Sequence, residues 1–334
     1  MPTTVNAAFN QFLTNIVNLA PTTNSSARKS RDWLIEQIHA LGNSDLTFPL
    51  FYKENDIFFG SFARRTKIRE LDDIDLMICL KATGSTYVEN GDRVYITAPG
   101  SSRLLHSLCN ANTNTLNSRM VINRFVFLLK KVPNYQNAII KRSMESCTLD
   151  LSSYTWSFDI VPCFITEPDD QGETYYVIPD GSGDWKMTDP RKDREAVTII
   201  NQHHGGNVLN VVRILKYWNN RQTAPSIPSY LLETMVLQYY LQHKNQPASQ
   251  FVDLEIPHLL NHISDSILKI VVDFKGIQGN LNTIPLADQI KVSTRAKFDY
   301  GVALKARAAE EANDHKGSIE SWGKIFGPDF PTYG

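Results

Sequence analysis

The spacing of hydrophobic residues predicts helices towards both ends of the chain. Over residues 5–41, apolar side chains recur at helical intervals, with a break at Pro21-Thr-Thr-Asn-Ser that either separates two helices or kinks one. After Pro190 the helical pattern returns in three segments, which cover 207–220, 228–244 and 258–274. The C-terminal part of the chain is therefore expected to be mainly helical.

The middle of the chain has a different pattern, made of short β-rich pieces. These are "DLMICL" (75–80), "RVYITA" (93–98), "CTLDL" (147–151), "SFDIVPCFI" (157–165) and "TYYVIP" (174–179). The chain has 334 residues, which is too many for one simple core, so two lobes are expected. The order of the elements indicates an α/β lobe followed by a helical lobe, with the N-terminal helix bracing both.

Three aspartates, Asp72, Asp73 and Asp75, stand directly before an apolar run. Residues 72–80 have a period of two, which predicts a strand. One face of this strand is apolar and consists of Ile74, Leu76, Ile78 and Leu80. Asp73 and Asp75 begin the other face, about 7 Å apart at their Cα atoms, and Asp72 is turned away from them. The face with the two aspartates continues with Met77 and Cys79, so the strand should run from a wet end into the interior.

Two carboxylates on one strand face suit a divalent cation better than a salt bridge, and hard oxygen ligands select Mg²⁺ or Mn²⁺. A calcium-binding loop would need further oxygen ligands and a glycine downstream, but three apolar residues follow Asp75. A glycosyltransferase D-x-D motif remains open on these residues alone. The upstream Gly60-Ser61 favours a phosphate ligand, because glycine lets the backbone approach closely and the Ser61 hydroxyl and nearby amides can hold a phosphate.

A third carboxylate is expected from Asp159. It lies in the strand-like "SFDIVPCF", with Phe158 and Ile160 on the opposite face. Three aspartates could hold two ions about 3.5–4 Å apart, which would activate an attacking hydroxyl and stabilise a departing pyrophosphate. The ordered combination of Gly-Ser, D-x-D entering a strand and "FDIVP" is much more specific than any one of its parts.

With these motifs in this order, the chain resembles the nucleotidyltransferase superfamily of polymerase β. Within it, the chain is similar to the bacterial cGAS/DncV-like nucleotidyltransferases (CD-NTases), which make cyclic oligonucleotide second messengers. The resemblance covers most of the chain and rests on "GSFARRTKIRELDDIDLMI", "FDIVPCF", "GDWKMTDPRKD", "VVRILKYWN", "IPSYLLE" and "SWGKIFGPDFP". It implies an α+β, bilobal, polymerase-β-like fold, with a mixed-sheet catalytic lobe and N-terminal spine helix over 1–185 and a helical lobe over 186–334.

The resemblance also implies roles for the acids and the Gly-Ser pair. Asp73, Asp75 and Asp159 would be the catalytic residues and the ligands of two Mg²⁺ or Mn²⁺ ions, and Asp159 would help to activate the attacking hydroxyl. Gly60 and Ser61 would hold the donor triphosphate.

From the helical lobe, the resemblance implies that Lys216 and Ser229 contact the phosphates of the donor nucleotide. Lys216 lies one residue beyond the apolar stripe of its helix, where an ammonium group can reach a cleft. Ser229 follows Pro228 and is also a candidate cap of the 228–244 helix.

Three other residues are candidates for contacts with the bases, namely Trp185, Tyr230 and Thr188, although each aromatic ring could equally pack between the lobes. The basic segment "ARRTKIR" (63–69) either contacts phosphates or an acceptor nucleotide, or is a solvated loop. His258 and His262 have H-x₃-H spacing, but Leu259 occupies the position of the glutamate in H-E-x-x-H, so a solvated or capping role is expected.

Composition narrows the possible partners and the setting of the protein. Lys and Arg number 34 against 35 Asp and Glu, and this net charge of −1 predicts no bulk attraction to nucleic acid. No apolar run approaches the length of a membrane span, and the N-terminus lacks the basic start of a signal peptide. The four cysteines are widely spaced without C-x-x-C, which is typical of reduced, mostly buried thiols in a cytoplasmic protein.

The leading functional hypothesis is an enzyme that joins nucleoside triphosphates, ATP among them with GTP or a pyrimidine nucleotide as further candidates, and cyclises the product with release of pyrophosphate. Resemblance to the family implies antiphage (CBASS) signalling, in which the product activates a separate effector protein without stable contact. Neither a membrane nor an obligatory nucleic acid is expected as a partner. The alternatives are a template-independent nucleotidyltransferase that acts on RNA or protein, and a nucleotide sensor without turnover.

Overall fold

The protein is described by a computed structural model of all 334 residues, and the chain divides into two compact units. The sheet unit comprises residues 21–63 and 70–191, and the helical unit comprises residues 1–20, 64–69 and 192–334. The fold is α+β, as predicted. The division falls near residue 191 instead of 185, and the first 20 residues and the segment 64–69 are grouped with the helical unit.

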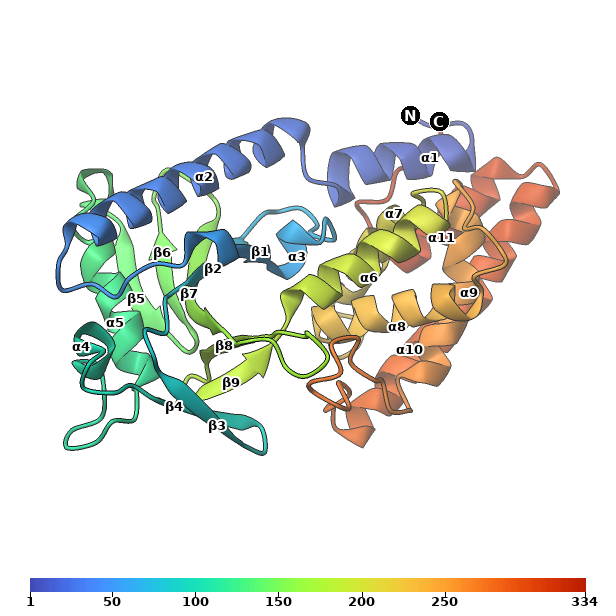
Figure 1. Cartoon of the computed structure of the whole chain (residues 1–334). Coiled ribbons are helices and arrows are strands. Elements are labelled where there is room, and N and C mark those ends of the chain that lie inside the picture. The colour runs from blue at the N-terminus through green and yellow to red at the C-terminus, as the bar shows by residue number, and fades with distance from the viewer. The chain divides into compact units, whose positions relative to one another are not determined.

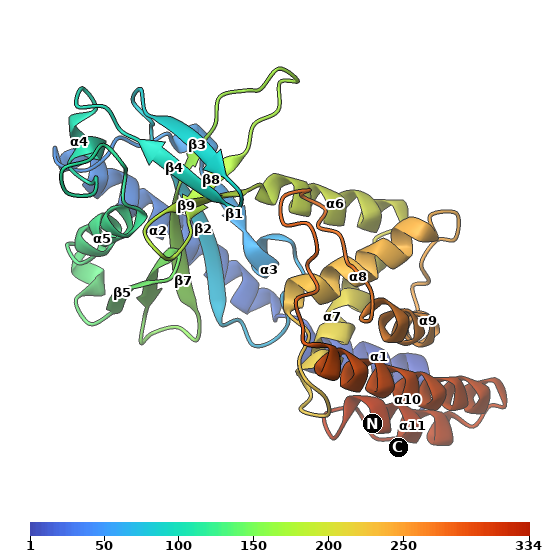
Figure 2. The same ribbon diagram turned by 90° about the horizontal axis from the view of Figure 1, so that it is seen from below.

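The sheet unit is built on a nine-stranded mixed sheet, drawn in Figures 1 and 2. Its main path has the order β1-β2-β7-β8-β9-β4-β3, and β6 pairs with both β5 and β7. Every pairing is antiparallel except that of β2 with β7. The strands are β1 (Ile57–Phe59), β2 (Asp73–Cys79), β3 (Thr86–Asn90), β4 (Arg93–Thr97), β5 (Ile139–Ser143), β6 (Ser146–Asp150), β7 (Ser157–Ile165), β8 (Tyr176–Pro179) and β9 (Trp185–Thr188).

Four helices accompany the sheet, and α5 packs against β5, β6 and β7 while α2 packs against α5. They are α2 (Pro21–Ser44), the one-turn α3 (Gly60–Ala63), α4 (Arg103–His106) and α5 (Ser118–Leu129). The N-terminal helical pattern is therefore two separate helices, because α2 begins at Pro21, where a proline fits the first turn of a helix. The predicted break at this proline is confirmed.

The helical unit has a core of buried aliphatic and aromatic side chains. Its helices are α1 (Val5–Phe12), continued by a π-helical turn at Leu13–Val17, then α6 (Pro190–His203), α7 (Val208–Asn220), α8 (Ser229–Gln242), α9 (Val252–Ser266), α10 (Leu286–Glu311) and α11 (His315–Phe326). An aromatic cluster joins the first helix to the last: the ring of Phe9 lies 5.1 Å from that of Trp322 and 5.0 Å from that of Phe330. The N-terminal segment is thereby fixed to the C-terminal end of the chain.

One predicted helix has different bounds. The pattern predicted a helix over 258–274, but α9 begins at Val252 and ends at Ser266, with Pro257 inside it. The helix ends there because the side-chain amide of Asn282 donates hydrogen bonds to the carbonyls of Ile267 and Lys269, which takes the chain out of helical hydrogen bonding. Sequence spacing alone does not reveal such a distant cap.

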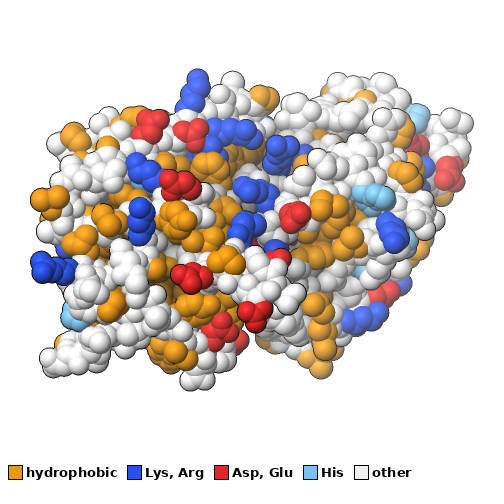
Figure 3. All heavy atoms as spheres, viewed as in Figure 1, with side chains coloured by type: hydrophobic (Ala, Val, Ile, Leu, Met, Phe, Trp, Pro, Cys, Tyr) orange, Lys and Arg blue, Asp and Glu red, His pale blue; other side chains and the backbone are white.

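No helix combines the length and the apolar character needed to cross a membrane. On the face drawn in Figure 3, acidic side chains are interspersed among the basic ones, as the near-zero net charge leads one to expect.

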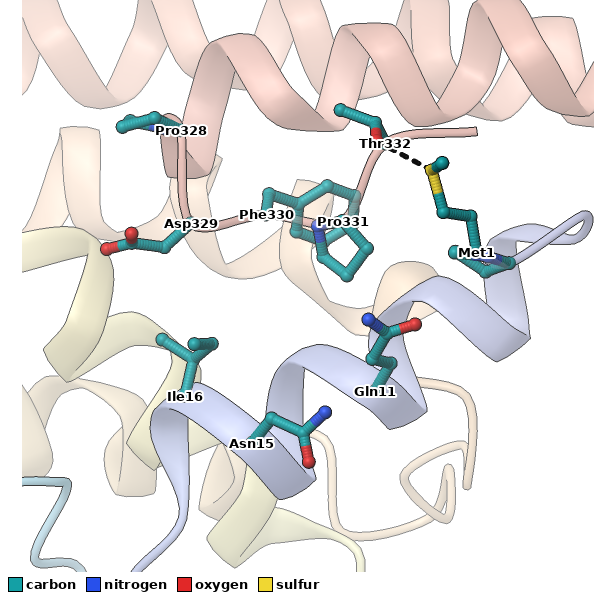
Figure 4. Close-up of a pocket in the computed structure, with 10 residues that line it drawn as sticks. Met1, Gln11, Asn15, Ile16, Pro328, Asp329, Phe330, Pro331 and Thr332 are labelled. Carbon is teal, nitrogen blue, oxygen red and sulfur yellow. Dashed lines mark hydrogen bonds between the residues drawn. The ribbon is translucent and has the colours of Figure 1, made fainter. Parts of the chain in front are cut away.

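A small cavity of about 310 Å³ lies in the helical unit beside the two chain ends (Figure 4). Gln11, Asn15 and Ile16 line it from the N-terminal helical segment, and residues 328–332 line it from the C-terminal tail. None of the predicted site residues borders it, so it belongs to the packing of the termini.

The aromatic cluster can be tested by truncation. Replacing the fully buried Phe9 by Ala should lower the free energy of unfolding by about 3–5 kcal/mol, because ring contacts are lost and a cavity remains. Chemical denaturation would measure this change. Phe298 in the same unit is 64% exposed, so Phe298→Ala should change stability by no more than about 0.5 kcal/mol. Equal losses in the two variants would contradict the assignment of Phe9 to the core.

Candidate active site

The two strands that carry the predicted acids lie next to each other. β2 and β7 run parallel, and their register pairs Asp75 with Asp159 and Asp73 with Ser157. Neighbouring strands are about 4.8 Å apart, so Asp75 and Asp159 are direct neighbours although 84 positions separate them in the sequence. The structure thus brings together the two acids that sequence reasoning could connect only through a motif.

The alternation along both strands puts the three carboxylates on one face of the sheet. Farther along, this face becomes a small buried cluster that contains Met77, Cys79, Val161 and Cys163. Asp73 and Asp75 are half-buried at the beginning of β2, and the remainder of the strand is buried. The prediction of a strand that runs from a wet end into the interior is confirmed.

Gly60 is placed against Asp75 by the pairing of β1 with β2. Phe59, the last residue of β1, is in register with Asp75, and Gly60 follows with a φ of +71°. A Cβ atom at residue 60 would lie 1.7 Å from Oδ2 of Asp75. Both the backbone angle and the close approach therefore require glycine here. Ser61 then lies in the first turn of α3, as expected for a short helix after the Gly-Ser pair.

Two hydroxyl groups from β6 hold the third acid. Ser146 Oγ and Thr148 Oγ1 donate hydrogen bonds of 2.9 and 3.0 Å to Oδ1 of Asp159. Both bonds fall on one oxygen, so they fix the rotation of the carboxylate. Neither hydroxyl was singled out from the sequence, although Thr148 lies in the "CTLDL" piece that predicted this strand.

The chemistry of these donors fits a hard divalent cation, since three carboxylates lie on one face and two of them are neighbours in the register. The structure nevertheless contains no group of three or more His, Cys, Asp and Glu side chains arranged to hold a metal ion. Asp73 is in register with Ser157, two positions before Asp159, and the Oδ1 atom of Asp159 is engaged by hydroxyls. Metal binding by these acids stays a prediction.

In the helical unit, Lys216 is buried instead of extending from its helix. Its Nζ atom lies 2.8 Å from Oε1 of Glu233 on α8, and the two side chains are 6% and 1% exposed. Arg64 Nε lies 2.9 Å from the other carboxylate oxygen, Oε2. Lys216 therefore takes part in a shared ion pair, in which one carboxylate holds two cations.

These contacts perturb the pKa values of all three groups. Burial lowers the pKa of Lys216 below its ordinary value, although the charge of Glu233 opposes this effect. Burial would raise the pKa of Glu233, but the charges of Arg64 and Lys216 outweigh it and leave that pKa low. For Arg64, burial would lower the pKa, but Glu233, Asp193 and Tyr230 together outweigh it and the pKa is raised. The carboxylate thus remains ionised and Arg64 charged.

Ser229 is the first residue of α8 and does not cap it. The cap position is taken by Pro228, no side chain makes a cap hydrogen bond, and Ser229 is exposed. The predicted capping role is wrong because helical geometry begins at the serine itself. An exposed hydroxyl at a helix N-terminus, beside backbone N–H groups without helical partners, remains suited to an anion.

The aromatic candidates for base stacking are already packed. Trp185 is fully buried and donates from Nε1 to the carbonyl of Leu116 at 2.9 Å, so it is not available to a base. The Tyr230 ring lies 5.4 Å from the Arg64 guanidinium carbon and 4.4 Å from Lys275 Nζ. Thr188 is half-buried on β9.

The basic segment 63–69 is largely structural. Arg64 pairs with Glu233, and Arg69 donates hydrogen bonds to the backbone carbonyls of Thr14, Asn15 and Asn18. The solvated loop considered from the sequence does not describe these two arginines, and the phosphate contact considered for this segment stays a prediction. Their role could not be read from the sequence because both sets of partners lie far away along the chain.

The prediction of buried cysteines is confirmed, since all four are unpaired and buried. His258 is exposed on α9, as predicted. His262 is not solvated: it is half-buried, lies 3.0 Å from the Ser266 hydroxyl and packs against the Tyr239 ring at 5.3 Å.

Comparison with known proteins identifies the family. The chain is 41% identical to a probable cyclic nucleotide synthase from Bacillus cereus (strain VD146) over 334 residues, which are 100% of this chain and 99% of that protein. The chain belongs to the CD-NTase family of cyclic nucleotide synthases. The fold agrees, because the structure of E. coli MS115-1 CdnC with ATP matches with a TM-score of 0.71 at 16% identity and covers 98% of each chain. CdnC in its complex with HORMA-deltaN matches with a TM-score of 0.70, again at 16% identity and 98% of each chain. No protein-family model matches the chain.

As a CD-NTase, this protein is a nucleotidyltransferase, and the resemblance drawn from its motifs is confirmed. In the sheet unit, the residues whose arrangement fits that chemistry are the acids of β2 and β7 and the glycine at the start of α3.

The close approach of Gly60 to Asp75 gives a direct test. Gly60→Ala should reduce cyclic nucleotide synthesis by this CD-NTase by about 100-fold, because the new methyl group must displace the Asp75 carboxylate. Gly91 is a matched control, with a φ of +60° and nothing within 4 Å of an added Cβ atom. Both variants place an alanine at a positive φ. In Gly91→Ala this strain should lower the free energy of unfolding by about 1–2 kcal/mol and leave the activity unchanged. Full activity of Gly60→Ala would show that the position of Asp75 does not matter.

Proposed function

We propose that this CD-NTase joins nucleoside triphosphates and cyclises the product in a metal-dependent reaction that releases pyrophosphate. The observation that carries the proposal is the parallel pairing of β2 with β7, which makes Asp75 and Asp159 neighbours on the face that also carries Asp73. Three carboxylates on a sheet face are unfavourable beside a polyanionic substrate unless cations compensate them.

In this proposal Asp73, Asp75 and Asp159 hold two Mg²⁺ or Mn²⁺ ions. When bound, such ions would neutralise the triphosphate and lower the pKa of an attacking hydroxyl. Asp159 orients the hydroxyl that attacks the α-phosphorus of the donor and accepts its proton, and its own orientation is fixed by Ser146 and Thr148. One phosphodiester bond forms as the bond to pyrophosphate breaks. Catalysis then consists of positioning and electrostatics without a covalent enzyme intermediate.

The donor triphosphate is assigned to Gly60, Ser61, Lys216 and Ser229. Gly60 exposes its backbone at the start of α3, and Ser229 presents a hydroxyl at the start of α8. Lys216 contributes positive charge from α7, where it is held by Glu233. ATP is the proposed first substrate, since the related CdnC structure contains ATP.

We propose an antiphage (CBASS) setting in the cytoplasm, in which the product activates a separate effector protein. The family supports this setting, and so do the four buried, unpaired cysteines. A protein partner that regulates synthesis is a further part of the proposal, supported by the related CdnC complex with HORMA-deltaN.

The test is product analysis with a matched pair of variants. The purified protein would be incubated with all four NTPs and Mg²⁺ or Mn²⁺, digested with phosphatase, and the surviving products identified by mass. The double variant Asp73→Asn, Asp75→Asn should form at least about 1,000-fold less product and remain folded, since it loses charges that stabilise the transition state. Asp72→Asn, exposed beside them, should keep its activity.

Retained synthesis in the double variant would overturn the assignment of the acids. If the nucleotides become attached to RNA or protein and no small phosphatase-resistant products form, the enzyme is a nucleotidyltransferase that acts on RNA or protein. If the parent protein binds triphosphate tightly but releases no pyrophosphate, even with the proposed regulatory protein present, it is a nucleotide sensor.

A further inference from the structure

One buried carboxylate in the helical unit binds Lys216, which the proposed function assigns to the triphosphate, and also binds Arg64. Glu233 on α8 is 1% exposed, and its two oxygens bind Lys216 Nζ at 2.8 Å and Arg64 Nε at 2.9 Å. We refer to Arg64, Lys216 and Glu233 as the Glu233 cluster. Glu233 lies in the quoted motif "IPSYLLE", but no sequence pattern assigned it a role.

The cluster is linked along the chain to every proposed phosphate contact. Ser229 precedes Glu233 by four residues, which is about one turn of α8. Lys216 is itself a member. Arg64 follows Ser61 by three residues, directly after α3. A displacement of Glu233 would therefore affect α7, α8 and the chain that leaves the Gly-Ser pair.

The charges of the cluster do not balance, because one carboxylate faces two cations. A buried ion group with a net charge of about +1 is costly unless an anion or water compensates it. Further basic and acidic groups act on it: Lys67 opposes the charge of Lys216, and Asp193 on α6 favours the charge of Arg64. Asp193 and Asp273, together with Lys275, balance the charges of the wider group of buried side chains.

Arg64 also packs against the aromatic ring of Tyr230, which is held by its own neighbours. The Tyr230 ring lies next to the Arg64 guanidinium group, and the Tyr230 hydroxyl lies within hydrogen-bonding distance of both Asp193 and Asp273. Lys275 lies 3.5 Å from Asp193 and 4.4 Å from the centre of the same ring. These contacts fix the ring, so Arg64 packs against a rigid neighbour in addition to its ion pair with Glu233.

We propose that Glu233 is a positioning residue for the donor triphosphate: it holds Lys216 and Arg64 at a fixed separation, so that together they present a localised positive charge to the phosphates. This rests on the proposed function, in which Lys216 contacts the triphosphate. Glu233 itself does not touch the substrate. Burial favours the neutral amine and lowers the pKa of Lys216, and the negative charge of Glu233 opposes this effect.

The test replaces Glu233 by its neutral isostere. Glu233→Gln should raise KM for the triphosphate, or Kd for a non-hydrolysable ATP analogue, at least about tenfold, whereas kcat at saturation should change much less. The pH dependence should shift as well. Phosphate binding requires protonated Lys216 and weakens as the pH rises through its pKa, so the weakening should begin at a lower pH in Glu233→Gln.

Two further variants separate positioning from stability. Asp253 is another buried carboxylate of the helical unit, paired with Arg307 at 2.5 Å, and Asp253→Asn should lower the unfolding midpoint without changing KM or the pH profile. Glu233→Asp keeps the charge on a shorter side chain. It should fold if Glu233→Gln does not, raise KM to a smaller extent, and leave the pH profile close to that of the parent protein.

The result that overturns the proposal is a folded Glu233→Gln or Glu233→Asp protein with the KM and pH profile of the parent. A rise in KM that Asp253→Asn reproduces would also overturn it. Failure of the proposed function is distinguishable, because titration of the Lys216 side chain by ¹³C NMR does not depend on turnover. If the parent protein makes no product, an unchanged Lys216 titration in Glu233→Gln or a wild-type affinity for the ATP analogue still refutes the role of Glu233.

Discussion

The parallel pairing of β2 with β7 is the constraint on which the candidate site depends. It makes two carboxylates, Asp75 and Asp159, neighbours at the wet end of a sheet whose far end is buried. Charges about 4 Å apart repel by about 1–4 kcal/mol in surroundings between water and a protein surface. The neighbouring strands accommodate this pair. Gly60, directly after β1, lies against Asp75, and two hydroxyl groups of β6 donate hydrogen bonds to Asp159. Such an arrangement is useful when cations are to be bound there.

The helical unit contains buried cations. Around Glu233, two cations share one acid in a buried position, and we propose that a triphosphate binds to these cations. A nucleoside triphosphate with its metal ions carries both kinds of charge. The electrostatics of each unit, taken separately, therefore agree with the nucleotidyltransferase chemistry of the family.

Sequence patterns predicted what depends on local periodicity. The strand that carries Asp73 and Asp75, the break at Pro21 and the helices α7 and α8 follow from spacing, and the acids, Gly60 and Ser61 follow from motifs. What could not be predicted depends on partners that are distant in the chain. The end of α9 is set by Asn282, and the burial of Lys216 is set by Glu233 and Arg64. A lysine beside an apolar stripe looks the same in a sequence whether it faces water or a buried carboxylate.

The central claim is that the acids of β2 and β7 hold the metal ions that serve the triphosphate. Anomalous diffraction from crystals grown with Mn²⁺ and a non-hydrolysable ATP analogue would measure this most directly. The account predicts Mn²⁺ peaks about 2.0–2.2 Å from carboxylate oxygens of Asp73, Asp75 and Asp159, with the phosphates of the analogue bound to the same ions. Peaks at other residues, with the analogue ordered and these three carboxylates free of metal, would contradict it.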